Sequence, residues 1–291
     1  MRDANRSVQK KISKHIKGER RNKVIGVVII FIIILVVNLP TISMFGTALK
    51  PRDIAISDTR LIAPPIEWSL DSFTYVIQRN IPASILNSLK VAVSVSVLIV
   101  LVSALAGYAL ARCRGKVFDV YSLLMLILQM FPTMLLLIPL FRIFSAFKLT
   151  NTPYSQILAY LAMNLPFSVW LLKGFFATIP FEMEEAAMID GCSQFQAFTR
   201  TVLPLSMPGV TTVAIFAFIN CWNEYTLACI FIRDSSKFPL TLMLQQFVQQ
   251  YSTDWAGMAA AAAIGTIPTL CFLVIAQKYL INGMTAGAVK G

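Results

Sequence analysis

Long apolar runs alternate with short polar segments along this chain. The apolar runs cover about residues 24–45, 85–111, 117–141, 157–172, 208–232 and 256–276. Each is near the roughly 20 residues that a helix needs to cross the hydrocarbon core of a bilayer. The pattern therefore predicts an all-α integral membrane fold with six transmembrane helices. The fourth run is the weakest because Pro166 interrupts it, although neighbouring helices can satisfy the backbone groups that a proline frees.

The composition agrees with a membrane protein. Hydrophobic residues make up 57% of the chain and charged residues 13%, and the mean hydropathy of +0.70 is far above that of a soluble domain. The net charge of +11 does not indicate nucleic-acid binding, because Lys and Arg crowd the N-terminus and the ends of apolar runs. The charge pattern therefore describes membrane topology.

Basic residues predict which side of the membrane each segment occupies. With both termini inside, 16 of the 25 Lys and Arg residues lie on the cytoplasmic side, so the positive-inside rule favours an N-in, C-in topology. The first apolar run is too long for a signal-peptide core, so we interpret it as a retained span, with a cleaved signal as the alternative. The expected order is a basic cytoplasmic tail (1–23), a first transmembrane helix (24–46), an extracytoplasmic loop (47–83), a core domain (84–277) that includes a cytoplasmic loop (179–204), and a cytoplasmic C-terminal tail (278–291).

Most catalytic chemistries are excluded by the residues available. His15 is the one histidine and lies in the basic tail, so a His-dependent triad or a multi-His metal site is not expected. The five cysteines form no CxxC pair and lie in or beside apolar runs, which indicates packing. The chain also lacks a G-x-x-x-x-G-K-[ST] sequence that would cradle phosphates. We therefore expect no catalytic residue, no metal site and no cofactor in this chain.

The cytoplasmic loop 179–204 carries the most information. Pro180 suits the first turn of a helix, and acidic residues in that turn favour the positive end of the helix dipole. These acidic residues are Glu182, Glu184 and Glu185. Gly191 should then bend or end the helix.

A second short helix should follow this bend. Ser193 and Gln196 have the S-x-x-Q spacing of a capping box, and the helix should end before Pro204. Apolar residues recur on one face of the loop, whereas its polar face is acidic. Because anionic lipid would repel an acidic face, the loop is better suited to a protein partner than to the membrane surface.

This loop resembles the EAA loop of permease subunits of ATP-binding-cassette importers, with Thr201 standing where the family has Ile. The matching residues are Glu185, Ala186, Ala187, Gly191, Leu203 and Pro204, spaced as EAA, three residues, Gly, nine residues and Ile-x-Leu-Pro. Asn87-Ser88, residues 222–225 and the tail 277–291 are similar to the carbohydrate branch, close to the maltose-type permease. The resemblance covers nearly the whole chain after Ile81.

The resemblance implies a type I importer fold with six spans and a pore-forming subunit that transports an oligosaccharide-like carbohydrate into bacteria across the cytoplasmic (inner) membrane. It implies that the matching loop residues couple the permease to an ATPase. The ATPase would drive alternating access, in which the substrate cavity opens to one side of the membrane and then to the other. The implied partners are a second permease subunit in a heterodimer, two ATP-binding-cassette ATPase subunits, an extracytoplasmic solute-binding protein and the lipid bilayer, with no nucleic acid. ATP and Mg would be bound by the ATPase subunits, so this chain would not itself be an enzyme.

Glu224 is the one acidic residue well inside an apolar run, where a carboxylate costs at least about 2.5–3.5 kcal/mol unless it faces water or a partner. Asn220, Trp222 and Asn223 lie within one turn of it, and such groups suit sugar hydroxyls. We predict that these four residues border the substrate pathway. The alternative is that Asn220 and Glu224 hydrogen-bond to a neighbouring helix and hold the bundle together.

Other functions fit the sequence less closely. A permease for another small polar solute is the alternative within the same family. A channel or secondary transporter outside this family would more often show several intramembrane ionisable groups or broken helices. An intramembrane enzyme would need paired acids, a nucleophile with a base, or metal ligands, whereas Glu224 stands alone in its run.

Overall fold

A computed structural model describes residues 2–55, 57–58, 60–248 and 253–288, with side chains between residues 22 and 278 of these ranges. The regular secondary structure of the described part is helical, apart from an isolated bridge between Val248 and Thr253. The α-helices are α1 (Arg2–Ala48), α2 (Asp71–Gln78), α3 (Ile81–Arg112), α4 (Lys116–Gln129), α5 (Thr133–Ala146), α6 (Pro153–Ala177), α7 (Glu182–Ile189), α8 (Gln194–Ala197), α9 (Leu203–Leu205), α10 (Met207–Trp222), α11 (Thr226–Phe231), α12 (Leu240–Gln245) and α13 (Trp255–Ala288).

The predicted all-α membrane fold is confirmed. Within the described residues, four helical segments are long and apolar enough to cross a bilayer, and up to six spans result if each of two bent helix pairs counts as one. The four segments are Asn22–Ala48, Ile81–Arg112, Pro153–Ala177 and Trp255–Lys278. Pro166 lies inside α6, which continues through it as an α-helix to Ala177.

The expected third run, 117–141, is not one straight helix. It divides into α4 and α5, which meet at an angle of 100°. Pro132 follows the break and disfavours helical geometry at Phe131, so α4 ends at Gln129 and α5 begins at Thr133.

The expected fifth run, 208–232, is also interrupted. It consists of α10 and the short helix α11, and residues 223–225 separate the two. Preceding α10, the segment Gln194–Leu205 is bent by 76° relative to Met207–Trp222. The break after α10 follows from the side chain of Glu224, which binds backbone N–H groups in the first turn of α11.

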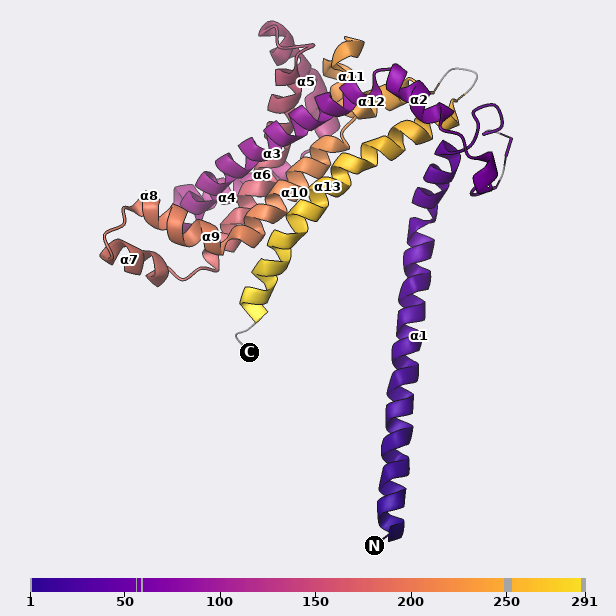
Figure 1. The fold of residues 1–291 in the computed structure, drawn as a ribbon. Coiled ribbons are helices and arrows are strands. Elements are labelled where there is room, and N and C mark those ends of the chain that lie inside the picture. The colour runs from indigo at the N-terminus through magenta and orange to yellow at the C-terminus, as the bar shows by residue number, and fades with distance from the viewer. Residues whose placement is uncertain (1, 56, 59, 249–252, 289–291) are drawn as a thin grey trace.

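The core of the bundle lies among α3, α6, α10 and α13, which run side by side in Figure 1. Fully buried side chains include Ile99, Leu172 and Phe218. Helices α3 and α6 approach closely at Gly107, where an added Cβ would lie 3.0 Å from the backbone N of Lys173. A side chain at this position would therefore push the two helices slightly apart.

Helix α1 stands apart from the bundle and joins it through its C-terminal end (Figure 1). The best apolar window of its span is 0% buried, and side chains from Val24 to Val37 are exposed. At 1.5 Å per residue the 47 residues of α1 extend for about 70 Å, which exceeds the thickness of a bilayer. The exposed apolar stretch of α1 therefore needs lipid or another protein around it.

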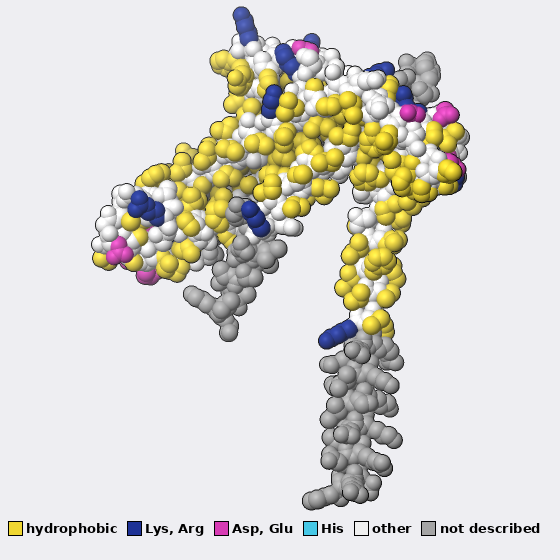
Figure 2. Space-filling view, viewed as in Figure 1, with side chains coloured by type: hydrophobic (Ala, Val, Ile, Leu, Met, Phe, Trp, Pro, Cys, Tyr) yellow, Lys and Arg dark blue, Asp and Glu magenta, His cyan; other side chains and the backbone are white. Residues whose placement is uncertain are grey.

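The bundle has two distinct ends. Helices α7 and α8 lie at one end, and α2, α12 and the connection after α1 lie at the other (Figure 1). Figure 2 shows hydrophobic side chains over the flanks, with the charged side chains mainly towards the ends. This distribution is that of a protein whose middle faces hydrocarbon.

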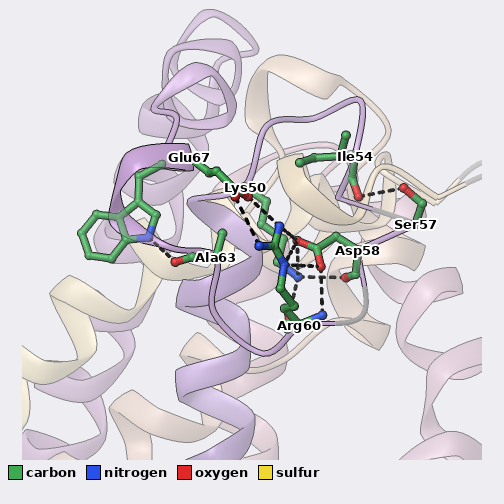
Figure 3. A network of polar contacts seen from close by, with 8 residues as sticks. Lys50, Ile54, Ser57, Asp58, Arg60, Ala63 and Glu67 are labelled. Carbon is green, nitrogen blue, oxygen red and sulfur yellow. Dashed lines mark hydrogen bonds and ion pairs between the residues drawn. The ribbon is translucent and has the colours of Figure 1, made fainter.

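The predicted loop 47–83 is folded around a buried lysine (Figure 3). Lys50 is 2% exposed, and its Nζ donates to the backbone oxygens of Asp58 (2.9 Å) and Arg60. The Arg60 guanidinium binds the carboxylates of Asp58 and Glu67. Hydrogen bonds from Arg60 lower the pKa of Asp58 to about 2, and the same bonds raise the pKa of Arg60.

Candidate functional site

The loop between α6 and α10 folds as two short helices, as predicted. Pro180 precedes α7, which carries the three glutamates in its first turn. The capping box is present: Ser193 Oγ accepts from the N–H of Gln196 (3.3 Å), and Gln196 Oε1 accepts from the N–H of Ser193 (2.9 Å). These reciprocal bonds start α8 immediately after the bend.

The prediction that the second helix ends before Pro204 is wrong. Helix α8 continues through a π-helical turn, Phe198–Val202, into α9, which contains Pro204. Pro204 lies at the start of α9, directly after the π-helical turn, whose wider i→i+5 spacing changes the hydrogen-bond register ahead of the proline, and the chain stays helical to Leu205.

The bend at Gly191 depends on backbone geometry. Its φ is +92°, which is outside the range that L residues readily adopt, and no atom lies within 4 Å of the place where a Cβ would stand. The requirement for glycine therefore comes from the turn between α7 and α8, because the space around it is open.

The predicted coupling residues form an accessible surface at this end of the bundle. Glu185, Ala186, Gly191 and Pro204 are exposed, whereas Ala187 and Leu203 are half-buried. Large apolar side chains stand out beside them, with Ile189 86% and Phe195 65% exposed; Phe181 and Met183 are also exposed. A surface of small, acidic and large apolar side chains at the end of the bundle is suited to binding another protein.

The opposite side of α7 is fixed to the bundle by Glu184, which sequence reasoning did not single out. Its carboxylate is buried, with Oε1 accepting from Arg112 Nε and Oε2 accepting from the Tyr108 hydroxyl at 2.7 Å. Arg112 also donates to the backbone oxygen of Ile179 at 3.0 Å. Tyr108 and Arg112 are four residues apart on one face of α3, and that spacing is the only signal in the sequence.

The predicted pathway residues are divided by the structure. Asn220 and Asn223 are exposed, and Asn220 Nδ2 donates to Asn164 Oδ1 on α6 at 3.1 Å. Trp222 is 7% exposed and stacks on Phe218 in the core, 5.7 Å between ring centroids. The pathway role of these residues stays a prediction. Because Trp222 is buried, its ring can only pack behind residues that line a pathway.

Glu224 is half-buried and makes contacts of the kind expected for a structural role. Its carboxylate accepts from the N–H of Leu227 (2.9 Å) and from the hydroxyl of Tyr160 on α6 (2.9 Å). Thr241 Oγ1 donates to the backbone oxygen of Glu224 at 2.8 Å, which links α12 to the break. Asn220 and Glu224 thus both make hydrogen bonds to the neighbouring helix α6, as the alternative to a pathway role requires.

The Asn87-Ser88 pair on α3 holds the segment before α12. Asn87 Nδ2 donates to the backbone oxygens of Ser236 (3.0 Å) and Phe238 (3.3 Å), and Ser88 Oγ accepts from the N–H of Leu240 (2.8 Å). Within the described part of the chain, no group of three or more His, Cys, Asp or Glu side chains could hold a metal ion.

Comparisons with known proteins identify the family. Residues 99–286 match the model of the binding-protein-dependent transport system inner membrane component. The chain is 35% identical to the sulfoquinovosyl glycerol transport system permease protein SmoH of Agrobacterium fabrum, over 89% of this chain and 91% of that protein. It is also 35% identical to the diacetylchitobiose uptake system permease protein DasC of Streptomyces coelicolor, over 87% and 91%.

The fold is also similar to that of a solved structure. A bacterial ABC transporter involved in the import of the acidic polysaccharide alginate matches with a TM-score of 0.75 and 20% identity, over 90% of this chain and 97% of that one. The resemblance read from loop 179–204 is thereby confirmed as a family relationship. The chain belongs to the family of binding-protein-dependent transport system inner membrane components, and it is a multi-pass inner-membrane transport permease rather than an enzyme.

Proposed function

We propose that this chain is a pore-forming permease subunit of an ATP-driven carbohydrate importer, and that the surface of loop 179–204 is where a separate ATPase binds. The observation that carries the proposal is the accessible side of α7 and α8, which presents Glu185, Ala186 and Gly191 outside the apolar bundle. Because the chain has no phosphate-binding loop, ATP and Mg belong to the partner.

The carbohydrate substrate is supported by the names of the similar relatives. SmoH and DasC are named for sulfoquinovosyl glycerol and diacetylchitobiose, and both cover most of this chain. The exposed amides of Asn220 and Asn223 can donate to and accept from sugar hydroxyls. In this proposal they face the pathway, Glu224 fixes their position, and Trp222 packs behind them.

The proposed complex has further partners. A second permease subunit, in a heterodimer, would complete the pore and cover part of the exposed span of α1. Two ATPase subunits would bind the coupling loops, and an extracytoplasmic binding protein would deliver the sugar. Both termini would lie in the cytoplasm, as the excess of basic residues there favours.

Stimulated ATP hydrolysis tests this function. The complex, purified with its binding protein and placed in lipid vesicles, should hydrolyse ATP faster when the matching sugar is added, in a panel of neutral and acidic oligosaccharides. The panel should also include amino acids and polyamines. Stimulation by a non-carbohydrate alone would overturn the proposed substrate class.

Topology is tested separately with reporter fusions. Fusions at Asp58 and at Ser193 should report opposite sides of the membrane, with Ser193 in the cytoplasm. The same side for both would contradict the proposed N-in, C-in arrangement.

A further inference from the structure

The surface of loop 179–204 explains where an ATPase could bind, but not how a movement of this loop would reach the membrane helices. Helix α7 has eight residues, and Glu182 and Glu185 on it are exposed. Glu184 is 1% exposed and points into the bundle, so it is the acidic residue of α7 that the bundle holds.

The carboxylate of Glu184 has a partner for each oxygen, and both partners belong to α3. The Arg112 guanidinium binds Oε1 and the Tyr108 hydroxyl binds Oε2 at 2.7 Å. The side chains of Arg112 and Glu184 are 11% and 2% exposed, so the charge pair is shielded from water and screened little by salt. A paired, hydrogen-bonded carboxylate of this kind fixes both distance and orientation.

Arg112 also connects a third segment to this pair. Its Nη2 donates to the backbone oxygen of Ile179, which lies between α6 and α7. One side chain at the end of α3 therefore holds both the chain entering α7 and the first turns of α7 itself.

The ring of Tyr108 extends the connection on its other side. It packs on Phe198 of the π-helical turn at 4.5 Å and on Phe176 of α6 at 6.1 Å, measured between ring centroids. Phe176 and Phe198 also contact each other at 5.9 Å. The joint thus gathers α3, α6, α7 and the turn after α8 around one carboxylate.

We propose that Glu184, Arg112 and Tyr108 form a rigid joint that transmits the displacement of the coupling loop into α3. Glu184 is a positioning residue, because it acts through α3 and touches neither ATPase nor substrate. The inference rests on the proposed function, since a joint of this kind matters only if an ATPase moves the loop. In the absence of the joint, α7 could move with the ATPase while α3 stays in place.

Distance measurements between spin labels test this directly. The labels would be attached at Met188→Cys on α7 and at Leu86→Cys near the outer end of α3, both exposed, in a chain whose five native cysteines are replaced. The whole complex, with ATPase subunits, would be measured without nucleotide and after trapping with MgATP and orthovanadate. In the parent, the distance between the labels should be the same in both states because α7 and α3 move together.

The joint is then broken by Glu184→Gln, which keeps the shape of the side chain and removes its charge. On trapping, the mean label distance in Glu184→Gln should shift by more than the width of the distance distribution in the parent. The ATPase subunit should be retained in full. Glu182→Gln, an exposed glutamate on the same helix, is the matched control and should behave as the parent.

Three outcomes contradict the inference. Parent-like distances in Glu184→Gln would show that the pair is a fold-stabilising contact without a role in transmission. A distance that already changes on trapping in the parent would show that α7 and α3 are not a rigid unit. If Glu184→Gln does not assemble, Tyr108→Phe removes one of the two carboxylate bonds and leaves the ring in place, and parent-like distances in that variant would contradict the joint.

Failure of the proposed function gives a different result. In that case the parent complex would bind no ATPase subunit or trap no nucleotide, and the inference would fall together with the function.

Discussion

Two carboxylates in this protein, Glu184 and Glu224, are held in similar ways at different places. Each lies at a junction between helices, and each accepts a hydrogen bond from a tyrosine hydroxyl, Tyr108 at 2.7 Å and Tyr160 at 2.9 Å. They differ in what balances their charge. Glu184 is paired with the guanidinium of Arg112, whereas Glu224 is held by backbone N–H groups at the start of α11.

This difference separates two structural roles. A full opposite charge on α3 binds α7 to an element that is distant in the sequence, and the buried pair depends on both members. Backbone N–H groups three and four residues on serve only to start the next helix, as a cap does. The Glu184 carboxylate is therefore a link between elements, and the Glu224 carboxylate at the break after α10 is chiefly a local cap with one hydrogen bond to α6.

Removal of the guanidinium should have the largest effect. Arg112→Ala leaves the Glu184 carboxylate buried and unpaired, so we expect a loss of about 3–5 kcal/mol in the free energy of unfolding. A denaturation titration in mixed micelles would measure it.

The double variant Arg112→Ala with Glu184→Ala serves as the control for this prediction. It should lose less than the two single variants added together, because it leaves neither charge alone. Additive losses would show that the two side chains do not interact.

The tyrosines allow a matched comparison of the two sites. Tyr108→Phe and Tyr160→Phe each remove one hydroxyl that donates to a carboxylate, so each should cost about 1.5–3 kcal/mol in the free energy of unfolding. The same titration measures both. A loss near zero for either would mean that the corresponding bond does not form in the folded protein.

The same substitution should have unequal effects at the two glutamates. Glu224→Gln keeps a carbonyl oxygen that can accept from the N–H of Leu227, so its stability loss should be below about 1 kcal/mol. Glu184→Gln leaves Arg112 without an anion and should lose more. Equal losses would contradict the distinction between a link and a cap.

The loop 47–83 should show the smallest effect on stability, and only at acidic pH. Hydrogen bonds from Arg60 lower the pKa of Asp58 from 3.8 to about 2, so Asp58 stabilises the fold above its unfolded pKa of about 3.9. This contribution should be lost as the pH falls from about 4 towards 2. Amide hydrogen exchange in residues 47–70, corrected for the intrinsic effect of pH, would detect it.

The Asp58→Asn variant should show the weakened protection of this loop already at pH 5. The amides of α6, a helix with no Asp or Glu of its own, serve as the internal reference. Unchanged hydrogen exchange of the loop amides between pH 4 and 2 in the parent would contradict the role of Asp58.

Much of the fold follows from local patterns in the sequence. The apolar runs predict α3, α6 and α13, and Pro180, Gly191 and the capping box predict α7 and α8. These features depend on residues that are close together in the chain. Breaks within apolar runs are harder to predict, because the bend at Pro132 and the cap at Glu224 do not change the hydrophobic pattern.

The different environments of the three glutamates in loop 179–204 could not be predicted. Glu182, Glu184 and Glu185 look alike in the sequence, and only tertiary packing buries one of them. The partner Arg112 is 72 residues away from Glu184, and nothing local indicates the pairing. In the same way, the apolar character of Trp222 is consistent with a pathway wall or with the core, and the structure places it in the core.

The proposed coupling depends on loop 179–204 as the site where an ATPase binds, and Gly191 offers the most direct test. Gly191→Leu forces an L residue to a φ of +92° and adds a bulky side chain to an exposed surface. Gly115→Leu is the matched control, because Gly115 is also exposed, has a φ of +133° and lies in the turn between α3 and α4. Ala187→Leu should disturb the surface in the same way as Gly191→Leu, and Glu185→Ala should do so less, because a charge at the rim of an interface contributes mainly to orientation.

The decisive measurement is the amount of ATPase subunit that copurifies with each variant, together with sugar-stimulated hydrolysis. We expect Gly191→Leu to keep the paired permease subunits in the membrane but to lose the ATPase or its stimulation, whereas Gly115→Leu should retain both. Full assembly and normal stimulated hydrolysis in the Gly191→Leu complex would show that the loop is not the coupling element.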